Sequence, residues 1–240
     1  MSNLKKIKLA RKLIEDGKKY YYIKNGKKRI YNSLCVTEEL ISGGENLLDV
    51  GGGDGRKYSF REYTEILCDI KYNYATRHDL DIRTQPLPYK NESFDIVVSH
   101  ETIEHLWLMK MGGMLCWEGI INFWKESYRV LKPGGTFYLS TRNRVSPLAL
   151  LKVLDNEYVQ VSWPRVDGSG HVNELCAKDL RRIAKITDLF VDNTTFSTSS
   201  LNPRYQQSVN QRTPRLRKFL DREILQEELY DTIHFISHKT

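Results

Sequence analysis

A short apolar segment that runs directly into a glycine-rich loop constrains this chain more than any other feature. Residues 47–55 read Leu-Leu-Asp-Val-Gly-Gly-Gly-Asp-Gly. The apolar residues predict a buried strand over residues 46–50. The glycines after it allow a ligand to lie against bare backbone, because glycine has no Cβ and tolerates positive φ. Asp49 lies at the end of this strand, where ligands of open α/β sheets bind. A simple tight turn is the alternative interpretation.

The spacing of the loop glycines argues against a dinucleotide. Gly51, Gly53 and Gly55 alternate, and the later glycine of the fingerprint Gly-x-Gly-x-x-Gly is missing. An acidic residue beside the loop also suits a cationic ligand better than a pyrophosphate. We therefore expect a ligand that carries positive charge.

A second strand is expected at residues 65–68, ending at Asp69. Only nine residues separate Asp69 from Asp79, whereas a crossover between parallel strands needs a dozen or more. The helix between the second and third strands is therefore expected to be missing or reduced to a turn.

The remainder of the chain predicts further strands and helices in alternation. Residues 94–99 form a nearly continuous apolar run, as in a parallel sheet covered on both faces. Helical sequence follows to about residue 131, with an interruption at Gly112-Gly113. We further expect a turn at 133–135, strands at 136–141, 190–196 and 232–237, and helices at 33–41 and 177–187.

Bulk properties limit the class of protein. A chain of 240 residues can form one large α/β domain with a proper core, and no apolar run approaches the ~20 residues that span a bilayer. The basic N-terminus lacks the apolar segment of a secretory signal. The cysteines are far apart and form no Cys-x-x-Cys pair, which indicates neither a zinc site nor a disulfide framework and favours a cytoplasmic location. They are Cys35, Cys68, Cys116 and Cys176.

The net charge of +7 is concentrated near the N-terminus. Residues 1–31 hold eleven Lys or Arg against Glu15 and Asp16, so the remainder is slightly acidic. Apolar residues recur with helical period over 3–16, which predicts a basic helix that packs on the domain or is attracted to an anionic partner. A smaller basic cluster runs from Arg204 to Arg222.

Several short motifs occur in a characteristic order. They lie at residues 47–55, 69, 79–80, 87–89, 94–99, 103–106, 129–135 and 170–172. Together they resemble the class I S-adenosylmethionine-dependent methyltransferases, and specifically the type 11 domain, over residues 45–198. The resemblance implies an α/β, Rossmann-like, doubly wound, mostly parallel seven-stranded sheet with an antiparallel late strand. It also divides the chain into a basic helical extension at 1–44 and a methyltransferase domain at 45–240.

The resemblance assigns cofactor-binding roles by position. Asp49, with Gly51, Gly52 and Gly53, would hold the amino-acid head group near the sulfonium cation. Asp69 and its neighbour Ile70 would lie at the ribose, where a carboxylate can accept from both hydroxyls. Asp79 would accept from the adenine amine while Leu80 packs on the ring. The alternative for each Asp is a cap or turn residue. The cofactor implied is S-adenosylmethionine, with S-adenosylhomocysteine as product.

Histidines are the candidate proton acceptors, because their pKa lies near neutrality. Ser99 and His100 follow the strand at 94–99, where the reactive methyl group should point. For His100 a role at the cofactor, a role as general base and a structural role remain open, and for His171 a catalytic or a structural role. Glu104-His105 is interpreted as packing. No ligand spacing supports a metal site.

The acceptor is not identified by any motif. Insertions at about 107–124 and 142–172 contain aromatic residues that line an acceptor pocket or fill the core. Trp107, Trp117 and Trp124 belong to the first, Tyr158 and Trp163 to the second. The leading hypothesis is O- or N-methylation of a small-molecule or glycan-like acceptor. The alternatives are an RNA methyltransferase, suggested by the basic segments, and an inactive binding protein that keeps the cofactor fold.

Overall fold

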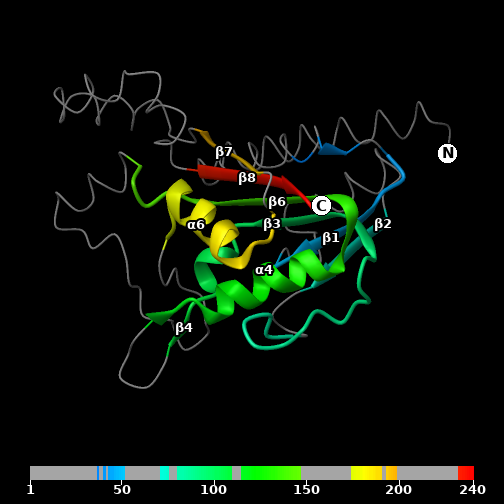
Figure 1. Ribbon diagram of the computed structural model, residues 1–240, viewed down its shortest axis with the longest axis horizontal. Coiled ribbons are helices and arrows are strands. Elements are labelled where there is room, and N and C mark those ends of the chain that lie inside the picture. Colours follow the sequence, from blue (N-terminus) through cyan, green and yellow to red (C-terminus); the bar gives the residue numbers. More distant parts are fainter. Residues whose placement is uncertain are drawn as a thin grey trace, which may run out of the picture.

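The computed structural model describes residues 37, 40–41, 43–51, 71–75, 80–109, 115–146, 174–190, 193–198 and 232–240. Its main feature is a six-stranded sheet in the order β2-β1-β3-β6-β8-β7. Figure 1 shows these strands side by side, with β7 and β2 at the two edges. The strands are β1 (Asn46–Val50), β2 (Lys71–Ala75), β3 (Phe94–His100), β6 (Leu131–Arg142), β7 (Asn193–Thr198) and β8 (Thr232–His238).

The strand directions agree with the predicted fold class. β1 is parallel to β2 and β3, and β3 is parallel to β6, whereas β8 is antiparallel to both β6 and β7. The mostly parallel α/β sheet with an antiparallel late strand is thus confirmed. Seven strands were predicted, and the described residues contribute six to the sheet.

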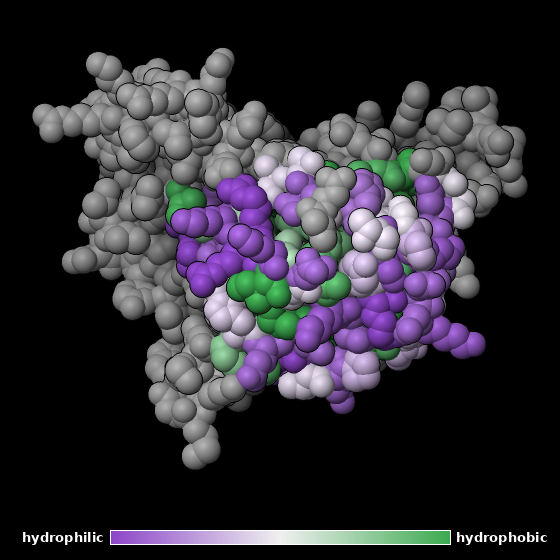
Figure 2. Space-filling view, in the orientation of Figure 1, coloured by the Kyte–Doolittle hydropathy of each residue, from purple (hydrophilic) through white to green (hydrophobic). Residues whose placement is uncertain are grey.

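Helices α4 (Glu118–Val130) and α6 (Ala177–Thr187) pack together on one face of the sheet. Both lie on the same side in Figure 1. Their apolar sides join a large core that includes Leu48, Val97 and Phe137, which are in register on β1, β3 and β6. The outer surface of this side is mostly hydrophilic, with hydrophobic surface in small areas (Figure 2). This is the expected arrangement for amphipathic helices that cover a sheet.

Trp124 is at the centre of this core. Its ring lies 5.4 Å from Phe137, 5.7 Å from Phe190 and 5.1 Å from Phe235, measured between centroids. Its side chain is fully buried. For Trp124 the core interpretation of the aromatic insertion is therefore correct.

The opposite face of the sheet has a smaller apolar cluster, formed by Leu47, Ile96, Val98 and Tyr138. Leu40 and Ile41 pack against it. Residues 37 and 40 are helical, as the predicted helix at 33–41 requires. Described apolar residues therefore cover both faces, and β1 and β3 are nearly continuous apolar strands because neither face is open to water.

Two predicted elements differ from the structure. The strand beside β1 is Lys71–Ala75, where the sequence had predicted residues 65–68; those residues lie outside the described ones. The helix predicted before residue 118 is instead an antiparallel pair, β4 (Leu108–Met109) and β5 (Leu115–Cys116). The rings of Trp107 and Trp117 lie 4.5 Å apart next to this pair, a contact that helical periodicity does not reveal.

The turn predicted at residues 133–135 lies within β6. The register with β3 shifts there, from Leu131 opposite Phe94 to Thr136 opposite Ile96. Gly134 has a φ of 74°, and its amide donates to the carbonyl of Lys239, 2.7 Å away. The extra residues are thus a bulge that is anchored to the end of the chain. The predictions for α6 and β8 are confirmed, and β7 begins three residues later than predicted.

No helix in the described part of the chain is long and apolar enough to cross a membrane.

Candidate cofactor site

The carboxyl ends of β1 and β3 bring four of the predicted site residues to one edge of the sheet. Asp49 is opposite Val98 in the parallel register, so Gly51 follows β1 where Ser99 and His100 end β3. The Asp49 side chain is 2% exposed. Parallel strands end together, and this geometry places the carboxylate, the bare glycine backbone and the end of β3 beside one another.

The loop after β1 is held against β3 by two hydroxyl groups. Ser99 Oγ donates to the carbonyl of Val50 at 2.9 Å. Thr102 Oγ1 lies 3.4 Å from the same carbonyl and donates to the carbonyl of His100 at 3.1 Å. Gly51 has a φ of 89°, and a Cβ on it would overlap the Thr102 side chain. Glycine is thus required here both for the left-handed backbone and for this close approach.

Thr102 is a residue that sequence reasoning missed. It reaches Gly51 because Glu101 takes the left-handed conformation, with a φ of 53°, which costs a non-glycine residue about 1–2 kcal/mol. The Glu101 amide donates to the carbonyl of Ser140 at 2.8 Å, so the turn is fixed to β6. Such conformations concentrate at functional sites. Neither periodicity nor motif spacing could have identified Thr102, because its contact with Gly51 depends on the conformation of this turn.

His100 is enclosed beside a row of polar residues on the sheet. Its Nδ1 lies 3.3 Å from Ser140 Oγ, and its ring packs edge-on against Tyr138 at 5.5 Å. Burial lowers the pKa of His100 to about 4. Tyr138 in turn shares a hydrogen bond with Nδ1 of His234 at 2.9 Å. Burial, together with the proximity of His100, lowers the pKa of His234 to about 3, so both imidazoles are neutral at pH 7.

Glu104 lies on the other face of the sheet, in a short 3-10 turn, η2 (Ile103–His105). Its carboxylate is fully buried and accepts a hydrogen bond from Thr141 Oγ1 at 2.8 Å. This contact ties the turn after β3 to β6 and supports the packing interpretation of the Glu104-His105 pair.

Other predicted residues are dispersed or lie outside the described ones. Leu80 is described and packs against the main core. Gly52, Gly53, Asp69, Ile70, Asp79 and His171 lie outside the described residues.

The three tryptophans of the first insertion have different environments. Trp107 is buried with Trp124, whereas Trp117 is 38% exposed at the start of α4. An acceptor-side role therefore remains open only for Trp117.

Within the described part of the chain, no three His, Cys, Asp or Glu side chains are grouped so that they could hold a metal ion.

Comparison with known proteins gives a sequence match over part of the chain. Residues 48–139 match the family described as a methyltransferase domain. A probable S-adenosylmethionine-dependent methyltransferase of Mycolicibacterium smegmatis is 31% identical over 117 residues, which cover 43% of this chain and 40% of that protein. The chain thus spans well under half the length of this curated relative.

Solved structures share the fold. An S-adenosylmethionine-dependent methyltransferase from Archaeoglobus fulgidus superposes with a TM-score of 0.55 at 13% identity, covering 92% of this chain and 97% of that one. One from Thermotoga maritima, a possible histamine N-methyltransferase, gives 0.51 at 14% identity, covering 95% and 97%. Residues 48–139 therefore match a methyltransferase domain, and the chain shares its fold with solved S-adenosylmethionine-dependent methyltransferases.

Proposed function

We propose that this protein transfers a methyl group from S-adenosylmethionine to a small-molecule or glycan-like acceptor, at an oxygen or a nitrogen. One observation carries the proposal. The buried Asp49 carboxylate and the left-handed Gly51 lie beside Ser99 and His100 at the carboxyl edge of β1 and β3. A carboxylate next to bare backbone suits a ligand with a cationic head group, and a charge-assisted hydrogen bond there contributes about 1.5–3 kcal/mol.

Several further residues have a proposed role on this cofactor. Gly52 and Gly53 would continue the bare backbone, and Asp79 and Leu80 would hold the adenine. The ribose role expected for Asp69 and Ile70 is not supported, because Lys71, which follows them, is opposite Asn46 at the amino edge of β1 and β2. When bound, S-adenosylmethionine supplies a methyl group activated by the sulfonium. Ser99 already holds the Val50 carbonyl, so its contribution is to fix the loop on which the cofactor would lie.

The state of His100 bears on the acceptor. A general base works best when its pKa lies near the operating pH, and burial lowers the pKa of His100 to about 4. Such an imidazole is a poor base for an unactivated alcohol. It can still accept a hydrogen bond and orient an acceptor that arrives with a free lone pair. This favours a neutral amine or an acidic hydroxyl, with positioning supplying much of the rate enhancement. His171 stays a second candidate base.

Cofactor binding tests the proposal most directly. Calorimetry should show the wild-type chain binding S-adenosylhomocysteine. Asp49→Asn should weaken that binding by about 1.5–3 kcal/mol, because the cationic head group loses a charge-assisted partner. Asp188→Asn is a matched control, since Asp188 is exposed at the end of α6. An unchanged affinity in the Asp49 variant would place the cationic head group elsewhere, and no binding at millimolar concentration would refute the function.

The acceptor class requires a transfer assay. Donor carrying a radiolabelled methyl group, incubated with separate pools of metabolites and of RNA, should label the metabolite pool. Labelling of RNA alone, with binding that weakens steeply as salt rises, would instead support an RNA methyltransferase. Cofactor binding without any transfer would support the inactive binding protein.

A further inference from the structure

Residues 80–93 connect the proposed adenine subsite to β3 without forming a helix or a strand. We call them the 80–93 loop. Backbone amides and carbonyls that are not paired in regular structure need other partners. Some are paired within the loop, where the amides of Thr84 and Gln85 donate to the carbonyl of Asp81 at 3.0 and 2.8 Å. Much of the remaining pairing comes from α4.

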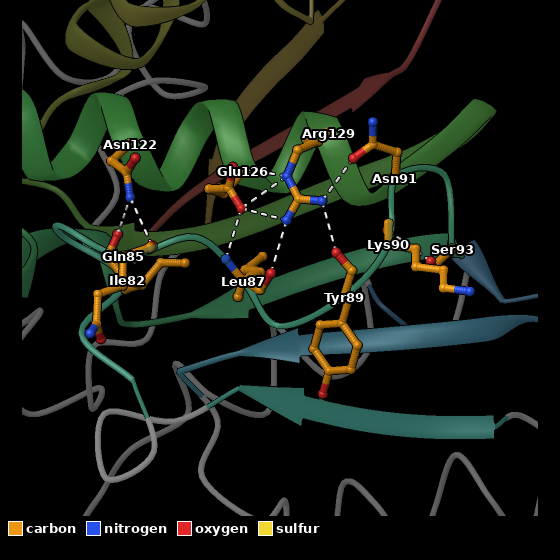
Figure 3. Close-up of polar contacts among 10 residues, drawn as sticks. All are labelled: Ile82, Gln85, Leu87, Tyr89, Lys90, Asn91, Ser93, Asn122, Glu126 and Arg129. Carbon is orange, nitrogen blue, oxygen red and sulfur yellow. Dashed lines mark hydrogen bonds and ion pairs between the residues drawn. The ribbon is translucent and has the colours of Figure 1, made fainter.

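Three polar side chains on α4 hold this loop, and Figure 3 shows them in a row above it. Asn122, Glu126 and Arg129 are spaced four and three residues apart, so they lie on one stripe of the helix. Asn122 Nδ2 donates to the carbonyls of Ile82 and Gln85, at 2.8 and 3.1 Å. This amide therefore fixes the part of the loop nearest the proposed adenine subsite.

Glu126 and Arg129 fix the middle of the loop. Glu126 Oε2 accepts from the amide of Leu87 at 2.7 Å, and Arg129 donates to the carbonyls of Leu87 and Tyr89 at 2.9 and 2.8 Å. Arg129 also donates to Glu126 at 2.6 Å. Burial opposes ionisation of Glu126, but the hydrogen bonds from Arg129 and the Leu87 amide outweigh it and lower its pKa. The pair is therefore a fixed, charged connector between helix and loop.

The helix also approaches the loop closely at its first turn. A Cβ on Gly119 would collide with the carbonyl of Leu106 and lie 3.1 Å from Cβ of Arg83. Arg83 is in turn held to Asp81 by paired hydrogen bonds of 2.8 and 2.7 Å. Thus the start of the loop, directly after Leu80, is placed by α4 from Gly119 to Arg129.

We infer that Asn122, Glu126 and Arg129 are positioning residues for the adenine end of the cofactor. They act through the main chain of the 80–93 loop, which begins at Leu80. This inference rests on the proposed function. It predicts that disturbing the stripe changes how well the protein recognises adenine, beyond any change in stability.

The sharpest test replaces Asn122 by an isostere. Asn122→Asp keeps the shape but points carboxylate oxygens at two carbonyls, and Asn122→Ala only removes the donors. We expect the dissociation constant for S-adenosylhomocysteine to rise about tenfold in the first and about threefold in the second. The preference for S-adenosylhomocysteine over its hypoxanthine analogue, S-inosylhomocysteine, should also fall, and it should fall more in Asn122→Asp than in Asn122→Ala.

A core variant separates positioning from stability. Ile183→Val removes one methyl group from a buried residue of a different helix, α6, and should lower the unfolding midpoint while leaving both dissociation constants unchanged. If Asn122→Asp does not fold, Asn122→Ala decides alone. Asn122 variants that keep the wild-type affinity and adenine preference would overturn the inference and leave the proposed function intact. A wild-type chain that binds neither nucleotide would overturn both.

Discussion

The two faces of the sheet differ in chemistry although they share the same strands. On the face covered by α4 and α6, β6 contributes Phe137 and Leu139 to an apolar core. On the opposite face the same strand presents Tyr138 and Ser140, which contact His234 and His100. Successive side chains of a strand point to opposite sides, so a single strand can serve both purposes.

The contrast shows how stability and function are distributed. The α4 face buries a cluster of aromatic rings, among them Trp124, Phe137 and Phe235. The opposite face carries polar groups that continue to the carboxyl edge, where His100 ends β3. We expect changes on the first face to affect mainly folding, and changes on the second to affect pH behaviour and the site.

Trp124→Ala should have the largest effect on stability. It removes a fully buried indole that contacts three phenylalanine rings, and such truncations cost about 3–5 kcal/mol. Urea unfolding measures the change. Trp117→Ala is the control, because Trp117 is 38% exposed and should cost far less. Equal losses for the two variants would contradict the assignment of the core to the α4 face.

The polar face should make stability depend on pH. The pKa values of His100 and His234 are lowered to about 4 and about 3, so the unfolded chain binds their protons first. The stability that these two neutral histidines contribute is complete above about pH 6.5. It is lost as the pH falls toward their pKa values in the folded chain. The free energy of unfolding should decrease by up to ~1.4 kcal/mol per pH unit for each group.

Unfolding of His234→Gln between pH 7.5 and 5.5 tests this dependence. The variant should show a shallower decrease than the wild type, since one of the two groups is gone. If the free energy of unfolding decreased equally with pH in the two proteins, His234 would have to be already protonated, or exposed, in the folded chain.

Tyr138→Phe should have the smallest effect. It removes the hydrogen bond of a buried hydroxyl to His234, worth about 1 kcal/mol. Tyr128→Phe is the matched control, because its hydroxyl bonds Thr240 at 3.4 Å near the surface. Thermal unfolding should rank Tyr138→Phe below Tyr128→Phe in stability. The reverse order would mean that the polar face does not depend on this bond.

Sequence patterns predicted the elements that are defined by local periodicity. β1 lies at residues 46–50 and α6 at 177–187, as expected. The prediction failed where long-range contacts decide. Residues before α4 have enough helix-forming character to be taken for helix, yet Trp107 and Trp117 pack beside a β pair. The strand that pairs with β1 lies at residues 71–75, whereas the strand predicted at 65–68 lies outside the described residues.

The sequence alone determined that an aspartate and a glycine lie close together at the end of a buried strand. Residue identity and spacing can be read directly from the sequence, without the fold. Only the tertiary structure decided that Thr102 closes on Gly51, that His100 is enclosed enough for its pKa to fall, and that α4 holds the 80–93 loop. These depend on atoms that are far apart in the chain, and both desolvation and close packing arise only when folding brings such atoms together.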